Sequence, residues 1–232
     1  MSETPAPSRM ITLGIVDDHQ VLTDALALII GGQPDIQVVG VAGTCAAARE
    51  LVSRACPDVL LLDVALPDGD GLSLVPDVAR RCPDANILVL TSFYDRKTLS
   101  RAIDAGVSGF VSKDRPLSEV IAAIRLAAEG EIVMPASLLL GLVARGAHAR
   151  GEREERSEYL AHHGREPLTS REREILVYLA GGLSGAAIAA KLQIAPLTVR
   201  THIRNLMEKL GVHSRLEAVA YALRHGLIEP PV

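Results

Sequence analysis

The 232-residue sequence contains no tryptophan, and aromatic residues make up only 3% of it. Proteins that bind single-stranded nucleic acid stack the bases on aromatic side chains, and sugar-binding sites use aromatic residues in a similar way. The composition argues against both kinds of site. Leu, Val, Ile and Ala must therefore supply the core, and an apolar content of 48% is high enough for a globular protein.

Cysteine and long apolar runs are also scarce. The three cysteines, Cys45, Cys56 and Cys82, have no spacing typical of a metal site, so we expect reduced thiols in a cytoplasmic protein. The first ten residues lack the apolar core of a signal peptide, and the longest nearly apolar run, residues 132–144, is too short to span a bilayer. The sequence predicts a soluble cytoplasmic protein that makes no contact with a membrane.

The net charge of −4 is unevenly distributed along the chain. Residues 1–130 contain 11 basic and 17 acidic side chains, whereas residues 165–232 contain 9 basic and 6 acidic ones. An acidic first half and a basic tail indicate two modules with different partners. Apart from residues 138–143, the segment between the two modules has no sustained apolar face. This predicts a linker over residues 131–166, and a packed extension of the first module is the alternative.

The first module alternates short apolar runs with helical patterns. Between the runs, apolar residues recur at helical spacing, as in Leu99, Ala102 and Ile103. Five such βα units predict an α/β domain whose parallel sheet is covered by helices on both faces. The predicted strands are residues 11–16, 36–42, 59–62, 87–90 and 109–111.

Reactive side chains follow four of these strands. Asp17 and Asp18 come after the first strand, Asp63 after the third and Thr91 after the fourth, and Lys113 stands two residues beyond the fifth. The carboxyl ends of parallel strands form one edge of the sheet, where open α/β proteins place their working site. We therefore expect three carboxylates, a hydroxyl and an amine to converge at this edge.

The expected cluster suits a magnesium ion and a phosphoryl group. Mg²⁺ prefers hard oxygen ligands and usually binds one or two carboxylates together with a phosphate. The available oxygen ligands are the carboxylates of Asp17, Asp18 and Asp63 and the backbone carbonyl of Ala65. With its charge balanced, the Asp63 carboxylate is able to attack phosphorus as a nucleophile. Lys113 and Thr91 are then placed to contact the phosphoryl oxygens.

Each of these residues alone has an ordinary structural explanation. Asp18 is suited to cap a helix that begins near Gln20, and a single lysine such as Lys113 is commonly a solvated cation. The joint placement at the ends of four strands favours the functional interpretation.

The tail predicts four short helices joined by tight turns that contain glycine. The expected helix starts are Thr169, Ser184, Pro196 and about Ser214. Helices of this length and spacing can contain a helix-turn-helix.

The helix that begins at Pro196 has one apolar and one polar face. Val199, Ile203, Leu206 and Leu210 recur at helical spacing and must face the core. The opposite face carries arginine and asparagine, which suit the edges of guanine and adenine in a major groove, although such a face is often only solvated. The predicted contacts to bases are Arg200, Thr201, Arg204 and Asn205, and those to phosphates are Thr198, His202 and Lys209.

Four motifs resemble the receiver domain of two-component response regulators: VDD at 16–18, LLLDVALPDGDG at 60–71, LTSF at 90–93 and GFVSKD at 109–114. The resemblance covers most of residues 10–130 and implies a flavodoxin-like, doubly wound fold with strand order 2-1-3-4-5. It also implies a histidine kinase that phosphorylates Asp63, Mg²⁺ bound at Asp17, Asp18 and Asp63, and a tight acceptor loop at Pro67 and Gly71.

The same resemblance implies a switch pair formed by Thr91 and Phe110. A phosphoryl group at Asp63 adds charge and acceptor oxygens, so the Thr91 hydroxyl is drawn inward and leaves space that the Phe110 ring can fill. Without the resemblance, Phe110 is simply a core residue.

The strings PLTSREREIL and TVRTHIRNLMEKLGVHSRLEAVAYA resemble the DNA-binding domain of LuxR/NarL-type regulators across residues 167–228. The resemblance implies that Arg200, Thr201 and Arg204 meet bases and that the helix from Ser214 mediates dimerisation.

The tail departs from the family pattern in two places. Relatives commonly have serine before the recognition-helix proline and a basic residue after it, where this chain has Ala195 and Leu197. The turn that is often Ser-Asn-Lys-Glu in relatives reads Ser184-Gly185-Ala186-Ala187 here. The missing cap predicts a helix less stable by about 1 kcal/mol. Fewer phosphate contacts predict weaker DNA binding with a shallower salt dependence.

The sequence as a whole predicts a DNA-binding response regulator, with a receiver domain over residues 10–130, a linker over 131–166 and a four-helix domain containing a helix-turn-helix over 167–232. Phosphorylation of Asp63 is expected to promote a homodimer that reads paired half-sites on double-stranded DNA and controls transcription.

Three rival functions remain open. An enzyme that turns over phosphoesters at Asp63 is disfavoured, because it needs a deep substrate pocket and a dedicated acid or base, and neither a histidine nor a second catalytic carboxylate comes just after Asp63. A receiver that dimerises without phosphorylation is disfavoured because all the acceptor residues are present. A nucleotide-binding domain is disfavoured because no glycine-rich loop follows the first strand.

Overall fold

The computed structural model describes residues 10–92, 95–134 and 167–229. The chain folds into two compact units, and the main division falls between Gly130 and Glu131. Most of the predicted linker, including the apolar residues 138–143, lies outside the described residues. Each unit is described by itself.

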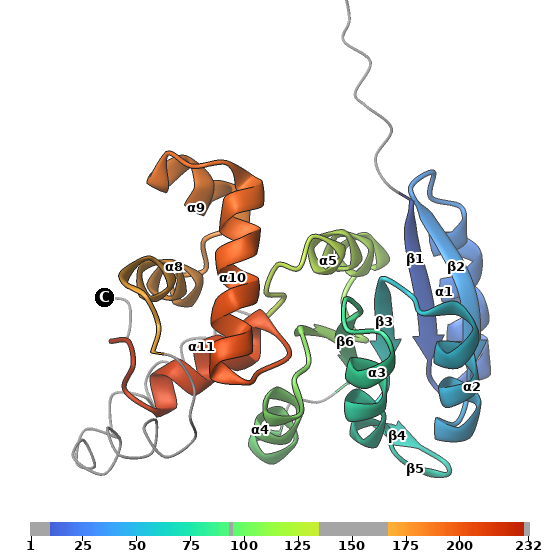
Figure 1. Ribbon diagram of the computed structural model, residues 1–232. Helices are drawn as coiled ribbons and strands as arrows, with labels where there is room; N and C mark the ends of the chain where they lie inside the picture. Colours follow the sequence, from blue (N-terminus) through green and yellow to red (C-terminus); the bar gives the residue numbers. More distant parts are fainter. Residues whose placement is uncertain (1–9, 93–94, 135–166, 230–232) are drawn as a thin grey trace, which may run out of the picture. The chain divides into compact units, whose positions relative to one another are not determined.

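The first unit is a five-stranded parallel sheet with helices between the strands (Figure 1). The strands are β1 (Ile11–Val16), β2 (Ile36–Ala42), β3 (Val59–Leu62), β6 (Asn86–Thr91) and β7 (Gly109–Ser112). The helices are α1 (Gln20–Gly31), α2 (Cys45–Ala55), α3 (Val75–Arg81), α4 (Arg96–Ala105) and α5 (Leu117–Ala128). The sheet order β2-β1-β3-β6-β7 confirms the predicted order 2-1-3-4-5.

The centre of the sheet explains the uninterrupted apolar run of β3. All four residues of this strand are fully buried, as expected for a strand covered on both faces. Backbone pairing continues past the strand ends, because Asp63 N donates to the Val16 carbonyl at 2.8 Å and Asp17 N donates to the Ala42 carbonyl at 3.0 Å. The sheet therefore fixes the backbone of both aspartates at its carboxyl edge.

A small hairpin follows Asp63, where the sequence had predicted only a loop. Its strands β4 (Ala65–Leu66) and β5 (Gly69–Asp70) are antiparallel and lead into a short 3₁₀ helix, Gly71–Leu74. The strands are two residues long, which is too short for a periodic pattern to reveal them.

Cys56 and Cys82 form a disulfide, so the expectation of reduced thiols is wrong for this pair, and Cys45 is a free, buried cysteine. The Cα atoms of Cys56 and Cys82 are 5.5 Å apart, within the usual range for a disulfide. Cys56 follows α2 and Cys82 follows α3, so the bond ties together the C-terminal ends of these two helices. Their proximity depends on the packing of the helices, which sequence spacing does not reveal.

Breaking this disulfide should destabilise the first unit. The bond joins residues 26 positions apart, and closing a loop of that length stabilises a fold by about 3 kcal/mol through the unfolded state. We expect the free energy of unfolding, measured in urea, to fall by this amount in the double variant Cys56→Ser, Cys82→Ser. Reductant should lower the free energy of unfolding of the oxidised wild type by the same amount and leave that of the double variant unchanged. The prediction is contradicted if the wild type keeps its free energy of unfolding after its disulfide is shown to be reduced.

The described residues of the second unit form four helices: α8 (Ser170–Ala180), α9 (Gly185–Leu192), α10 (Pro196–Leu210) and α11 (Arg215–Arg224). The predicted starts are confirmed, because Thr169, Ser184 and Ser214 each accept a backbone hydrogen bond as N-cap residues. Thr169 forms a full capping box with Glu172. Leu176, Ile188, Leu206 and Val219 are among the buried residues of a core shared by all four helices.

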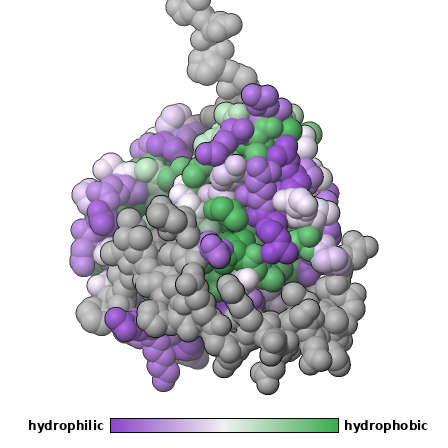
Figure 2. Space-filling view, turned by 90° about the vertical axis from the view of Figure 1, so that its left-hand side faces the viewer, coloured by the Kyte–Doolittle hydropathy of each residue, from purple (hydrophilic) through white to green (hydrophobic). Residues whose placement is uncertain are grey.

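Two large apolar residues of the second unit, Val177 and Leu197, are exposed. Figure 2 shows hydrophobic patches lying among hydrophilic residues on one face of the described part of the chain. Within the described ranges, the helices are too short or too polar to cross a lipid bilayer.

Candidate functional site

The structure brings the predicted acidic residues together at the carboxyl edge of the sheet. Ligand atoms of Asp17, Asp18, His19 and Asp63 all lie within 4.8 Å of one another. Asp17 and Asp63 are buried, at 2% and 7% exposure, whereas Asp18 and His19 are exposed. Two carboxylates thus point into a region of reduced solvation, which is costly unless a cation lies nearby.

Lys113 supplies one such cation. Its Nζ atom lies 2.5 Å from Asp17 Oδ2 and 2.6 Å from Asp63 Oδ2. The backbone N–H of Lys113 donates to the Thr91 carbonyl at 2.9 Å, which continues the pairing of β6 with β7. Burial disfavours the charged ammonium, but the hydrogen bonds that it donates to Asp17 and Asp63, together with their negative charge, outweigh this effect and raise the pKa of Lys113. Lys113 is therefore an ammonium ion held between two carboxylates.

His19 is a member of this cluster that sequence reasoning missed. Its Nδ1 lies 3.0 Å from Asp17 Oδ1 and 2.9 Å from Asp18 Oδ1. Its position directly after the two aspartates was the available signal. His19 is also the N-cap residue of α1, and it makes no side-chain cap hydrogen bond. The alternative in which Asp18 caps this helix is therefore wrong.

The acceptor loop, residues 63–71, folds closely around Asp63. Asp63 Oδ1 accepts a hydrogen bond from Ala65 N at 3.1 Å, and Gly71 N donates to the Val64 carbonyl at 2.8 Å. A Cβ atom at Gly71 would lie 2.1 Å from the backbone oxygen of Asp63. Only glycine fits at this position without movement of the Asp63 backbone.

Thr91 and Phe110 lie on the two strands at one side of the sheet. Thr91 ends β6 and is partly buried, whereas Phe110 lies in β7 with only 3% exposure. Phe110 pairs with Val89 and Thr91 pairs with Ser112, two positions along the same ladder. The predicted switch residues therefore stand on neighbouring strands.

The donor set fits a hard divalent cation. The cluster contains three carboxylates, and the Lys113 ammonium pairs with two of them, which leaves an excess of negative charge. Among the described residues, the buried atom Asp17 Oδ2 has no hydrogen-bond partner besides its close contact with the Lys113 ammonium. Carboxylate oxygens in this number are the ligands that Mg²⁺ takes in proteins.

Helix α10 has the two faces that its sequence predicted. The apolar residues Val199, Ile203, Leu206 and Leu210 are buried. Arg200, Thr201 and Arg204 are exposed, and so is Thr198, whereas His202, Asn205 and Lys209 are partly buried. Ala195 provides no side-chain cap, which confirms the expected loss of that hydrogen bond.

Lys209 is engaged inside the unit. Its Nζ atom lies 2.9 Å from Glu172 Oε2, and the Glu172 side chain is 3% exposed. Burial raises the pKa of Glu172, but its bonds with Thr169 and Lys209 outweigh burial and lower the pKa overall. Lys209 therefore differs from Arg200 and Arg204, which extend into solvent.

Comparisons with known proteins match both halves of the chain. Residues 13–125 match the family described as response regulator receiver domain. Residues 166–222 match the family described as bacterial regulatory proteins, luxR family.

Similar proteins align over almost the whole chain. The DNA-binding transcriptional activator DevR/DosR of Mycobacterium tuberculosis is 35% identical over 96% of this chain and 98% of its own. The response regulator protein VraR of Staphylococcus aureus is 34% identical over 92% of this chain and 97% of its own. A solved LuxR-family two-component response regulator from Aurantimonas sp. SI85-9A1 aligns with a TM-score of 0.52 and 26% identity, over 55% of this chain and 91% of that one.

Proposed function

The chain belongs to the two-component response regulators that join a receiver domain to a LuxR-type DNA-binding domain, and from this premise we propose that a histidine kinase phosphorylates Asp63 and that the phosphorylated protein dimerises on DNA. The observation that supports this most directly is the placement of the Lys113 ammonium between Asp17 and Asp63. It puts a nucleophilic carboxylate, a second carboxylate and a phosphate-binding cation at one point.

In the proposed reaction, a carboxylate oxygen of Asp63 attacks the phosphorus atom of a phosphohistidine on the kinase. The bond from phosphorus to the imidazole nitrogen breaks, and an aspartyl phosphate forms. Lys113 and the Thr91 hydroxyl contact the new phosphoryl oxygens. Asp17, Asp18, Asp63 and the Ala65 carbonyl would hold Mg²⁺, which would supply charge neutralisation when bound.

Phosphorylation then changes the packing of side chains around β6 and β7. Movement of the Thr91 hydroxyl toward the phosphoryl group leaves space beside β6, and the Phe110 ring moves into it. This repacks the outer strand β7 and its helices, and so changes the surface available for dimerisation.

The proposed DNA interface is the exposed face of α10. Arg200, Thr201, Arg204 and Asn205 read base edges, while Thr198 and His202 contact phosphates. Lys209 is less available for a phosphate contact, because its ammonium group forms an ion pair with Glu172. In a two-fold dimer, two such helices read paired half-sites.

The phosphorylation step is tested by incubating the full chain with acetyl phosphate and Mg²⁺ and measuring intact mass. We expect one added phosphoryl group, located on Asp63, and none after chelation of the metal. Phosphorylation should also raise the fraction of dimer in sedimentation. Continuous hydrolysis of unrelated small phosphoesters contradicts the proposal, because it indicates an enzyme.

The DNA-binding step is tested with Arg204→Ala, measured on genomic fragments selected by the phosphorylated protein. An arginine that reads a base contributes about 1–3 kcal/mol of discrimination, so we expect affinity for the selected fragment to fall about tenfold or more. Affinity for random DNA should fall much less. Arg173→Ala is the matched control, because Arg173 is an exposed arginine of α8 that donates to the Leu227 carbonyl. Equal losses in both variants contradict base reading by Arg204.

A further inference from the structure

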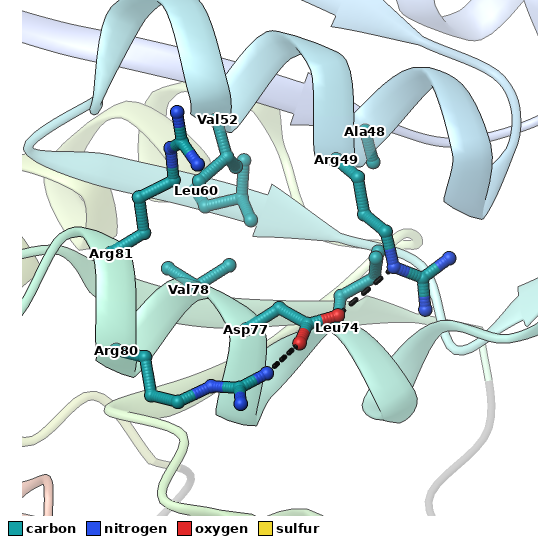
Figure 3. A pocket seen from close by; sticks show the side chains of 9 residues that line it. All are labelled: Ala48, Arg49, Val52, Leu60, Leu74, Asp77, Val78, Arg80 and Arg81. Carbon is teal, nitrogen blue, oxygen red and sulfur yellow. Dashed lines mark hydrogen bonds and ion pairs between the residues drawn. The ribbon is translucent and has the colours of Figure 1, made fainter.

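A pocket of about 470 Å³ lies between α2 and α3 (Figure 3). Its volume falls within the range of about 300–1000 Å³ that is typical of small-molecule sites. The floor is apolar and includes Val52, Leu60 and Val78, which are almost completely buried. None of the acceptor-site residues lines this pocket.

The rim of the pocket carries an excess of positive charge. Arg49, Arg80 and Arg81 line it, together with a single carboxylate, Asp77. Arg49 Nε donates to Asp77 Oδ2 at 2.9 Å, and Arg80 binds the other oxygen. Hydrogen bonds from Arg49 and Arg80 lower the pKa of Asp77, which therefore stays ionised.

Of the three arginines that line the pocket, Arg81 is the one without a carboxylate partner among the described residues. It donates one hydrogen bond, to the Ser53 carbonyl at 3.3 Å, from α3 to α2. In Figure 3 its side chain extends along the pocket beside Val52 and Leu60. A planar guanidinium group binds a carboxylate through two parallel hydrogen bonds, so this position suits an organic anion.

The walls of the pocket are joined covalently at one end. The Cys56–Cys82 disulfide joins the C-terminal ends of α2 and α3, one residue from Arg81. The other end of α2 is fixed to the turn between β4 and β5, where Asp68 accepts hydrogen bonds from the backbone N–H groups of Cys45 and Ala46, at 2.7 and 3.0 Å. A ligand therefore meets a largely preformed site and loses less free energy in ordering it.

We propose that this pocket binds a small amphipathic carboxylate, whose head group binds Arg81 and whose chain occupies the groove between α2 and α3. The anionic head neutralises part of the excess charge at the rim. This function goes beyond the phosphorylation of Asp63 and is independent of it.

The test is a titration of the isotope-labelled full chain with sodium octanoate, followed by amide chemical shifts. We expect saturable shifts that concentrate on α2 and α3. Two ligands of the same chain length separate the contributions: 1-octanol keeps the apolar part without the charge, and octyltrimethylammonium reverses the charge. Octanoate should bind at least tenfold more tightly than either.

The matched variants are Arg81→Glu and Arg54→Glu. Arg54 is an exposed arginine of α2 that pairs with Glu50 and does not line the pocket. Arg81→Glu should weaken octanoate binding at least tenfold, while Arg54→Glu should change it less than twofold. Thermal melts confirm that both variants are folded.

Several results overturn the proposal. Octanol binding as tightly as octanoate shows an apolar groove with no anion site. Equal binding by wild type and Arg81→Glu removes the proposed head-group contact. Shifts that spread over Val21, Leu28 and Ile29, which are exposed apolar residues of α1, show that the pocket is not a ligand site. The absence of any shift at millimolar octanoate shows the same.

Discussion

The Asp63→Asn variant should take up no phosphoryl group under conditions that modify most of the wild-type chain. The asparagine amide has nearly the same shape as the carboxylate and can still accept the hydrogen bond from Ala65 N, which is 3.1 Å long in the wild type. It cannot act as the nucleophile. We therefore expect the variant to fold, to gain no mass with acetyl phosphate and Mg²⁺, and to show no phosphodonor-dependent gain in DNA affinity.

A matched control is Asp84→Asn, which removes an exposed carboxylate in the turn before β6. This variant should be phosphorylated at the wild-type rate and should bind DNA more tightly afterwards. Phosphodonor-dependent DNA binding by Asp63→Asn refutes the proposed role of Asp63. Phosphorylation of Asp63→Asn at another residue is recognised by mapping the modified position. If this modification does not change the affinity for DNA, Asp63 is still the regulatory acceptor.

The second large effect is expected for Gly71→Ala. The added Cβ lies 2.1 Å from the backbone oxygen of Asp63, and backbone atoms cannot yield as a flexible side chain does. Overpacking of this kind costs about 3 kcal/mol of folding free energy. A displacement of about 1 Å at a reacting group lowers a rate by roughly a hundredfold, so we also expect a loss of tenfold or more in the phosphorylation rate.

Gly43→Ala is the control for this prediction. Gly43 is also near the acidic cluster, but its nearest atoms to an added Cβ are Asp17 O and Asp18 Cα, both at 3.8 Å. Urea unfolding and a time course with acetyl phosphate should show little change in this variant. Similar behaviour of the two variants contradicts the importance of the close approach at Gly71.

Much of the acceptor site could be predicted because it depends on local sequence patterns. Apolar runs that end in Asp17, Asp63 and Thr91 place these residues at one edge of a parallel sheet, whatever the details of packing. The stripe Val199, Ile203 and Leu206 follows from the helical repeat alone.

What the sequence did not reveal depends on tertiary contacts. Cys56 and Cys82 meet only because α2 packs beside α3, and Lys209 meets Glu172 only because α10 packs on α8. The contact of Gly71 with Asp63 depends on how a short hairpin turns back on the strand. None of these pairs has a fixed spacing that a pattern can detect.

The position of the Lys113 ammonium also has a consequence for when the protein responds. In the resting state this group already serves as the counterion of Asp17 and Asp63, so it competes with any cation that approaches from solvent. An arriving phosphoryl group attracts the ammonium to itself and so releases the carboxylates. We therefore expect the receiver to respond only when a metal ion and a phosphoryl group are both present. A rise in metal concentration alone should leave it inactive.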